Sequence, residues 1–162
     1  MPRVWVSIGS NIDRERHVRA AVAALRERFG ELVVSPVYET PAEGFAGDPF
    51  YNLVAGFFTD VPPSGLHEAL REIENRNGRV RGAAKFSART LDIDALTYGD
   101  ARTDEGGKHL PRDEIVRYAF VLKPLADVAP EEIHPEAGRS YRELWQAYDG
   151  GGSEMHEVPL AL

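Results

Sequence analysis

The sequence predicts a single α+β domain in which an antiparallel sheet carries both of its main helices on one face. Two observations support this fold class. Strand and helix patterns follow one another in the order β-α-β-β-α-β up to residue 98, which is typical of a ferredoxin-like domain. The chain has 162 residues, 43% of them hydrophobic and 28% charged, which is the size and composition of one ordinary globule.

The first strand is predicted over Arg3 to Ser7, because Val4, Val6 and Ile8 alternate with other residues. Ser10 to Asp13 has the Ser-x-x-acid spacing of a capping box, so a helix should begin there. Apolar residues then recur at helical spacing until a glycine that is expected to end the helix. They are Val18, Ala21, Val22, Leu25 and Phe29, and the glycine is Gly30.

The rest of the core pattern contains three more strands and a second helix. The strands are predicted over residues 32–38, 50–59 and 91–98, with a Pro/Gly-rich loop over residues 40–49. Apolar residues 66, 69, 70 and 73 line one face of the helix, and Gly78 closes it.

The segment after residue 98 should add a strand or turn around Ala119 to Leu122 and one more helix. Ser140 and Glu143 have capping-box spacing and predict the start of that helix. Gly150 to Ser153 is expected to free the last residues, so we predict one domain over residues 1–149 and a flexible tail over residues 150–162. No internal repeat is visible.

Composition limits the possible chemistry. The chain has no cysteine, which excludes a disulfide framework and a thiolate metal site. A net charge of −7 argues against nucleic-acid and anionic-membrane partners, and no apolar run approaches membrane-spanning length. We expect a cytoplasmic monomer that acts on small molecules.

One basic window stands out in this acidic chain. Residues 75–91 contain five cationic residues and no acid, although the whole chain has 26 acids and 19 bases. The window leads directly into Asp92 and Asp94, which share one face of a predicted strand. Two neighbouring carboxylates repel each other unless a cation lies between them, and Mg²⁺ prefers such oxygen ligands together with phosphates. Cations beside a carboxylate pair are typical of phosphoryl transfer, and no P-loop motif is present.

Asp-x-Asp pairs are common, so a second interpretation stays open. Asp92 and Asp94 could face solvent on an edge strand beside a solvated basic loop. Phe50 and Asn52 also share a strand face, and they offer a stacking surface and a hydrogen-bonding edge for a heterocycle. Here too a simpler interpretation exists, with Phe50 in the core and Asn52 at a turn.

At these positions the sequence resembles the hydroxymethyldihydropterin pyrophosphokinase family of folate biosynthesis, whose fold is ferredoxin-like. The resemblance runs from Val4 to about Pro135, and its most specific part is the basic loop that leads into Arg-Thr-Leu-Asp-Ile-Asp. The matching segments are Ile8 to Asn11, Tyr38 to Pro41, Phe50 to Asn52, Glu74 to Arg81, Lys85 to Asp94, Ala119 to Leu125 and Ala129-Pro130.

The resemblance implies that Asp92 and Asp94 bind two Mg²⁺ ions, which bridge the phosphates of the co-substrate ATP. It implies that Phe50 and Phe120 sandwich a pterin ring, and that the substrate hydroxyl attacks the β-phosphorus and releases AMP. The other implied site residues are Thr40, Pro41, Glu43 and Asn52 around the pterin, Glu74, Arg81, Lys85 and Arg112 on the ATP side, and Arg79 and Arg89 as catalytic residues on mobile loops.

Three positions depart from the family pattern, all on the ATP side or in the closing loop. Arg112 stands where a histidine is usual, and its charge cannot titrate near neutral pH. Tyr118 stands where an arginine is usual, with Arg117 one residue earlier. Phe86 and Ser87 replace the usual tryptophan and small residue of the basic loop.

Three other functions remain open from the sequence. A non-catalytic ligand-binding regulator on the same scaffold would not explain the basic loop beside paired carboxylates. An RNA-binding sheet is disfavoured by the acidic charge and by the lack of a matching aromatic strand motif. A divergent paralogue that takes another alcohol would keep every feature above.

Overall fold

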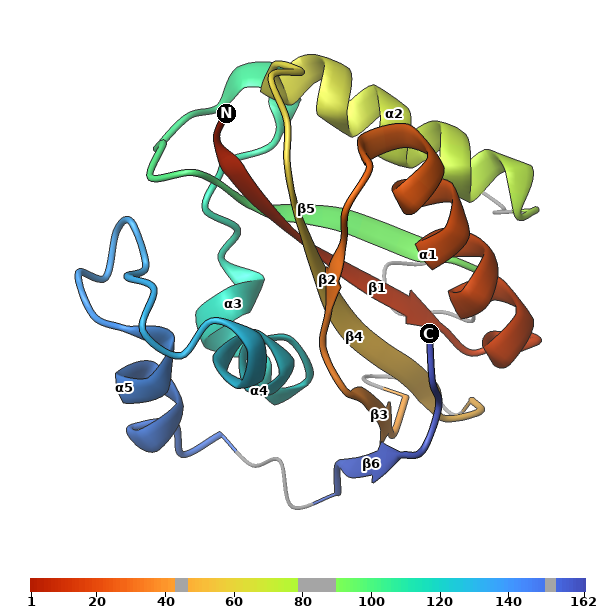
Figure 1. Ribbon diagram of the computed structural model, residues 1–162. Helices are drawn as coiled ribbons and strands as arrows, with labels where there is room; N and C mark the ends of the chain where they lie inside the picture. Colours follow the sequence, from red (N-terminus) through yellow and green to blue (C-terminus); the bar gives the residue numbers. More distant parts are fainter. Residues whose placement is uncertain (43–46, 79–89, 151–153) are drawn as a thin grey trace.

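The computed structural model describes residues 1–42, 47–78, 90–150 and 154–162, and its core is an antiparallel sheet (Figure 1). The strands are β1 (Arg3–Ser10), β2 (Val33–Val34), β3 (Val37–Thr40), β4 (Phe50–Phe58), β5 (Asp92–Tyr98) and β6 (His156–Val158). The helices are α1 (Arg14–Phe29), α2 (Pro63–Arg76), α3 (Glu114–Arg117), α4 (Ala119–Val128) and α5 (Tyr141–Gln146), with a short 3-10 turn, η1 (Glu105–Gly107).

The strand order is β5-β1-β4-β3-β6, with β2 also paired to β4, and every pairing is antiparallel. The first four strands of this path have the order of a ferredoxin-like sheet, which confirms the predicted fold class. The N-terminal strand β1 is therefore central, with β4 on one side and β5 on the other.

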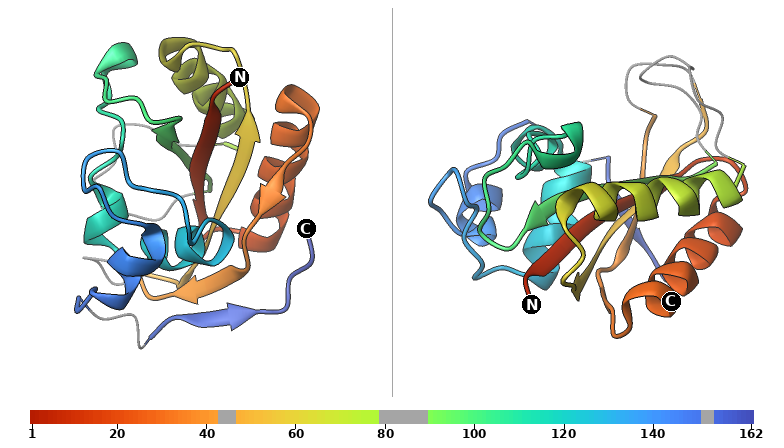
Figure 2. Two further views of the ribbon diagram at one scale, coloured as in Figure 1. Left: turned by 60° about the vertical axis from the view of Figure 1, so that its left-hand side comes forward. Right: turned by 90° about the horizontal axis from the view of Figure 1, so that it is seen from above.

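The two faces of the sheet bury different cores. On one face, β1 residues Val4, Val6 and Ile8 pack against α1 and α2. On the other face, Trp5, Val54 and Leu96 pack against α3, α4 and α5. Figure 2 shows these three later helices gathered on the opposite side of the sheet from α1. This second helical layer stops short of the end of the sheet where β1 finishes and β4 and β5 begin, and the candidate site lies at that end.

The predicted capping box at Ser10 and Asp13 is wrong. Helix α1 begins at Arg14 after Asp13, whose φ of 48° is left-handed, and Asp13 makes no side-chain cap. The Ser10 hydroxyl instead donates to the Thr90 carbonyl at 2.6 Å, because Ser10 still belongs to β1 and Thr90 lies just before the neighbouring strand β5. The other end agrees with the prediction, since Gly30 ends the helix with a φ of 84°.

The predicted strand over residues 32–38 is interrupted. Ser35 and Pro36 separate β2 from β3, because proline has no N–H to donate to the ladder. Ser35 still pairs with β4, since its N–H donates to the Val54 carbonyl at 3.0 Å and its hydroxyl accepts from the Val54 N–H at 2.9 Å.

The predicted strand or turn at Ala119 to Leu122 is wrong, because these residues form the start of helix α4. The apolar spacing that marks this helix appears only over the longer stretch that includes Leu125, Ala126 and Ala129. The predicted capping box of α5 is confirmed, since Ser140 and Glu143 exchange both hydrogen bonds.

The last described residues do not extend freely from the domain. Strand β6 pairs with β3 at the edge of the sheet, and Leu160 and Leu162 pack against the first core. Arg19 of α1 donates to the Ala161 carbonyl at 2.8 Å. The sequence did not indicate this pairing, because a three-residue edge strand has almost no sequence pattern of its own. The expectation of a flexible tail from residue 150 was made without it. No helix in the described part of the chain is long and apolar enough to cross a membrane.

Candidate active site

A transverse row of paired residues crosses the open end of the sheet. Tyr38 pairs with Asn52, Asn52 with Gly9, and Gly9 with Asp92, so the row runs over β3, β4, β1 and β5. Directly paired residues project to the same face of a sheet, and neighbouring strands lie about 4.8 Å apart. The predicted pterin residue Asn52 and the predicted metal ligand Asp92 therefore share one face, about 10 Å apart, with only a glycine between them.

Gly9 makes room for the amide of Asn52. A Cβ on Gly9 would lie 2.7 Å from Asn52 Oδ1 and 3.8 Å from Phe50 Cδ2. The Asn52 Nδ2 donates to Thr40 Oγ1 at 2.7 Å, which fixes the amide across the backbone of β1. Phe50 is half-buried at the beginning of β4. The structure therefore brings Thr40, Phe50 and Asn52 together as a small polar and aromatic floor.

Asp92 and Asp94 lie next to this floor on the same sheet face. Both are half-buried and alternate with the buried Ile93 and Ala95 of β5. Between them, the Ile93 N–H donates to Glu74 Oε2 at 2.9 Å, and Glu74 is only 6% exposed. Helix α2 thus holds β5 from the opposite face at the residue between the two aspartates. Glu74, predicted on the ATP side, has this buried structural contact.

A lysine that sequence analysis did not single out contacts Asp94. Lys108 Nζ lies 3.1 Å from Asp94 Oδ1, with the two side chains 48% and 22% exposed. Lys108 reaches this position because residues 99–110 turn back along β5, where Thr103 and Leu110 form an antiparallel bridge. No local signal marks this residue, because the contact depends on how the turn folds.

Arg112 also faces the aspartates. Its N–H donates to the Leu96 carbonyl of β5 at 2.8 Å, and its guanidinium donates to Glu114. Burial is the largest single influence and lowers the pKa of Arg112, but the Glu114 hydrogen bond and the charges of Asp94 and Asp92 together outweigh it, so the pKa is raised. Arg112 is consequently a fixed, permanently charged cation beside the carboxylate pair.

A histidine of helix α2, His67, lies near Lys108 and Arg112. Burial, followed by the charges of Lys108 and Arg112, lowers the pKa of His67, so its imidazole is held neutral. Its Nε2 atom is buried and has no hydrogen-bond partner among the described residues. Gly106 covers the ring, since a Cβ there would lie 2.6 Å from His67 Cδ2.

Phe120 lies in the first turn of α4, which covers the same sheet face as Phe50. Its ring stacks on Tyr118, with centroids 5.0 Å apart and planes inclined by 23°. Helix α4 is tied to β3 by the Tyr38 hydroxyl, which donates to Asp127, and Lys123 Nζ lies 2.6 Å from Asp127 Oδ1. Burial, and then Asp127, raises the pKa of Tyr38, which keeps its hydroxyl protonated as a donor.

The start of α1 holds the segment that leads into Phe50. Asn11 Nδ2 donates to the Asp48 carbonyl at 3.0 Å, and Arg14 donates to the Pro49 carbonyl at 3.1 Å. The Arg14 guanidinium also lies 3.9 Å from the centroid of the Tyr51 ring and pairs with Glu39 at 2.5 Å. These contacts of Asn11 and Arg14 hold the beginning of β4 against the start of α1.

Part of the predicted site falls outside the described residues. Among the predicted site residues these are Glu43, Arg79, Arg81, Lys85 and Arg89, together with the departures Phe86 and Ser87. Pro41 is described and exposed, directly after Thr40. The sequence singled out Gly9 only as part of the segment Ile8 to Asn11 that resembles the family. A glycine inside a strand pattern is itself a signal of close backbone approach.

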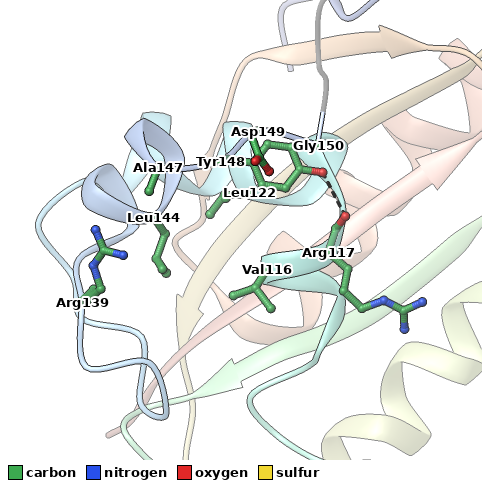
Figure 3. A pocket seen from close by; sticks show the side chains of 9 residues that line it. All are labelled: Val116, Arg117, Leu122, Arg139, Leu144, Ala147, Tyr148, Asp149 and Gly150. Carbon is green, nitrogen blue, oxygen red and sulfur yellow. Dashed lines mark hydrogen bonds between the residues drawn. The ribbon is translucent and has the colours of Figure 1, made fainter.

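A separate pocket of about 440 Å³ opens between α3, α4 and α5 (Figure 3). Val116, Leu122, Leu144 and Ala147 contribute apolar lining, and the Tyr148 hydroxyl donates to the Arg117 carbonyl at 2.9 Å at its wall. None of the residues predicted for the site lines this pocket. It is therefore a different region from the row at the open end of the sheet.

The carboxylate pair fits a magnesium ion that obtains its remaining ligands elsewhere. Among the described residues, no group of three or more His, Asp or Glu side chains is placed to hold a metal. Two half-exposed carboxylates on one strand face suit Mg²⁺, which typically uses one or two carboxylates and completes its octahedron with water and phosphate oxygens. A polar and aromatic floor beside a carboxylate pair and nearby cations is the arrangement of an enzyme that transfers a phosphoryl or diphosphoryl group.

Comparison with known proteins agrees with this class. The model of the family described as 7,8-dihydro-6-hydroxymethylpterin-pyrophosphokinase (HPPK) matches residues 5–130. A Pseudomonas aeruginosa 2-amino-4-hydroxy-6-hydroxymethyldihydropteridine pyrophosphokinase is 40% identical over 157 residues, covering 94% of this chain and 95% of that protein. A protein of the same name from Methylorubrum extorquens is 35% identical, covering 97% of this chain and 100% of that protein.

A solved structure whose name includes HPPK has a similar fold. The crystal structure of Plasmodium falciparum HPPK-DHPS with SDX-DHP superimposes with a TM-score of 0.75 at 13% identity, over 97% of this chain. This chain spans only 47% of that longer protein, and the likeness shows the fold alone. The class defined by fold and site is thus an ATP-dependent diphosphotransferase. The chain belongs to the 7,8-dihydro-6-hydroxymethylpterin-pyrophosphokinase family, whose members are named for this activity in folate synthesis.

Proposed function

We propose that this chain transfers the terminal diphosphate of ATP to the hydroxymethyl group of 6-hydroxymethyl-7,8-dihydropterin and releases AMP. The observation that carries the proposal is the shared sheet face of Asn52 and Asp92, separated by Gly9. A heterocycle on the floor of Phe50 and Asn52 would then have its alcohol beside phosphates held at Asp92 and Asp94. Family membership supports both the reaction and the substrates.

In the proposed reaction, the substrate hydroxyl oxygen forms a bond to the β-phosphorus of ATP. The bond between this phosphorus and the oxygen bridging to the α-phosphate breaks, AMP leaves with the electron pair, and the hydroxyl proton passes to solvent. Asp92 and Asp94 would hold two Mg²⁺ ions, which when bound neutralise charge on the phosphate oxygens.

The chain's own residues have two further proposed tasks. Arg112, fixed by Glu114 and by β5, would hold phosphate oxygens with a permanent charge. Asn52 would read the edge of the pterin, with Phe50 and Phe120 as stacking surfaces and the segment around Thr40 and Pro41 beside it.

Other proposed roles rest on the family resemblance. They comprise Glu43 at the pterin, Arg81, Lys85 and Glu74 on the ATP side, and Arg79 and Arg89 as catalytic residues. The monomeric state and cytoplasmic location expected from the sequence also stay predictions.

The test measures AMP formation by the purified protein from Mg-ATP with and without hydroxymethyldihydropterin. Formation of AMP that requires the pterin would support the proposal. ATP use with ADP as the product, or AMP formation without the pterin, would contradict it. Turnover with a different alcohol, and none with the pterin, would identify a divergent paralogue.

A further inference from the structure

Lys108 and Arg112 are two different kinds of cation beside the same carboxylate. Arg112 is held by its N–H on Leu96 and by the hydrogen bond from its guanidinium to Glu114, and its side chain is 20% exposed. Lys108 is 48% exposed, and its one side-chain ion pair among the described residues is with Asp94 at 3.1 Å. One cation is fixed, and the other is free to move.

The position of Lys108 conflicts with a metal on Asp94. An ammonium 3.1 Å from Asp94 Oδ1 takes up one of the lone-pair directions through which this carboxylate could bind a divalent cation. The positive charge of the ammonium would also repel a metal bound at the same carboxylate. An exposed Lys–Asp pair contributes little free energy, so an incoming metal complex can break it at small cost.

We propose that Lys108 is an exchangeable counter-ion of Asp94, which it neutralises in the ligand-free protein and leaves when a metal–nucleotide complex binds. The released ammonium then pairs with a phosphate oxygen of the nucleotide. This inference rests on the proposed function for the identity of the ligand. It adds a positioning residue that binds either the carboxylate or the triphosphate.

The surroundings of Lys108 favour this exchange. Its four-carbon stem is flexible and its ammonium is a compact donor that can change partners without a fixed geometry. The backbone on either side is held, because Gly106 packs on His67 and Leu110 is buried and paired with Thr103. The side chain can therefore move while its anchor stays in place.

The experiment measures two dissociation constants for the wild type and for Lys108→Met. One is for Mn²⁺ alone, followed by electron paramagnetic resonance, and the other is for α,β-methylene-ATP with Mg²⁺, whose carbon bridge blocks transfer. Arg102→Met is the matched control, since it removes one exposed positive charge from the same turn without touching Asp94. Lys108→Arg keeps the charge at the position.

Opposite changes are expected in Lys108→Met. Mn²⁺ alone should bind about three- to tenfold more tightly, because a competing cation is gone. The Mg-nucleotide analogue should bind about tenfold more weakly, because a charge-assisted hydrogen bond to phosphate is lost. Arg102→Met should change neither constant by more than about twofold, and Lys108→Arg should retain most of the affinity for the analogue.

Unchanged Mn²⁺ affinity in Lys108→Met would overturn the role as a counter-ion. Tighter binding of both ligands would overturn the transfer to phosphate and leave Lys108 as a competitor only. Both measurements are independent of turnover. If the chain formed no AMP while the opposite shifts appeared, the proposed reaction would fail and the exchange would stand.

Discussion

The carboxylate of Glu74 accepts a hydrogen bond from the Ile93 N–H at 2.9 Å and thereby connects α2 to the strand position between the two site aspartates. Glu74 is 6% exposed, so this bond lies in the interior. The side chains of Asp92 and Asp94 project from the other face of the same strand. The alignment of the carboxylate pair thus depends on a contact that a ligand on the open face never meets.

Glu74→Ala is expected to destabilise the protein by about 1.5–3 kcal/mol, because it leaves the buried Ile93 N–H without its charged acceptor. Urea unfolding of the variant and the wild type measures this difference. Glu72→Ala is the control, since Glu72 is exposed on the same helix and pairs only at the surface with Arg28 and Arg76. Equal stability of Glu74→Ala and the wild type would show that Glu74 acts solely through a ligand.

Asp92→Asn and Asp94→Asn should each abolish turnover while the fold persists. Each change removes a negative charge from the proposed metal ligands but keeps the size of the side chain, and both residues are half-exposed. AMP formation and thermal unfolding are measured together. Asp100→Asn, an exposed position just beyond the same strand, should behave as the wild type. Full activity of either site variant at millimolar Mg²⁺ would refute the metal assignment.

Gly9→Ala should weaken pterin binding through Asn52. The new methyl would lie 2.7 Å from Asn52 Oδ1 and must displace the amide, at a cost of about 1–3 kcal/mol in stability. A double-mutant cycle with Asn52→Ala, in which the free energy of unfolding is measured, isolates this clash. In the Asn52→Ala background the same glycine substitution should cost clearly less, whereas a cost unchanged by Asn52→Ala would place the strain in the backbone.

Arg112→Ala should weaken binding of Mg-ATP by about 1.5–3 kcal/mol, or roughly ten- to a hundredfold, if a charge-assisted bond to phosphate is lost. Arg112→His should lose more affinity at alkaline pH, where the imidazole is neutral, because arginine keeps its charge throughout. Arg117→Ala is the control, since Arg117 pairs with Asp113 at the surface. Equal nucleotide affinity of Arg112→Ala and the wild type would place Arg112 outside the site.

His109 should contribute a pH-dependent part of the stability. Hydrogen bonds to Glu136 and Asp104, both at 2.8 Å, raise its pKa. Its contribution should therefore be fully present below the unfolded-state value of about 6.5 and be lost as pH rises through the raised folded value. Urea unfolding of the wild type and His109→Gln across this range should show a difference that shrinks with increasing pH. A difference independent of pH would contradict the ion-pair role.

The sequence predicted the parts of the fold that repeat a period over many residues. Helix α1 and the alternation of β1, β4 and β5 each extend far enough for the apolar pattern to be unambiguous. The predictions for short segments were wrong or missing, because these segments are too short to show a period. Residues 119–122 contain too few turns to distinguish a helix from a strand, and β6 is an edge strand of three residues defined by its partner rather than by its own sequence.

The candidate site was predictable where its residues are neighbours in the chain. Asp92 and Asp94 share a face because strand geometry alone requires it, and the same is true of Phe50 and Asn52. Their placement side by side required the pairing of β1 with both β4 and β5. Lys108 reaches Asp94 only through the turn over residues 99–110, which no periodicity encodes, and the same turn places Gly106 against His67 of α2.

The central position of β1 has a consequence for how the chain is made. Val4 pairs with Phe57 on one side and with Tyr98 on the other, so β1, which is synthesised before both of its partners, gains its second neighbour only after residue 98 has been synthesised. Until then β1 would expose an unpaired, strongly apolar edge, the kind of segment that recruits chaperones or aggregates. Translation rate and chaperone supply should therefore affect the yield of this protein more strongly than they affect a domain of the same size whose sheet forms from consecutive hairpins.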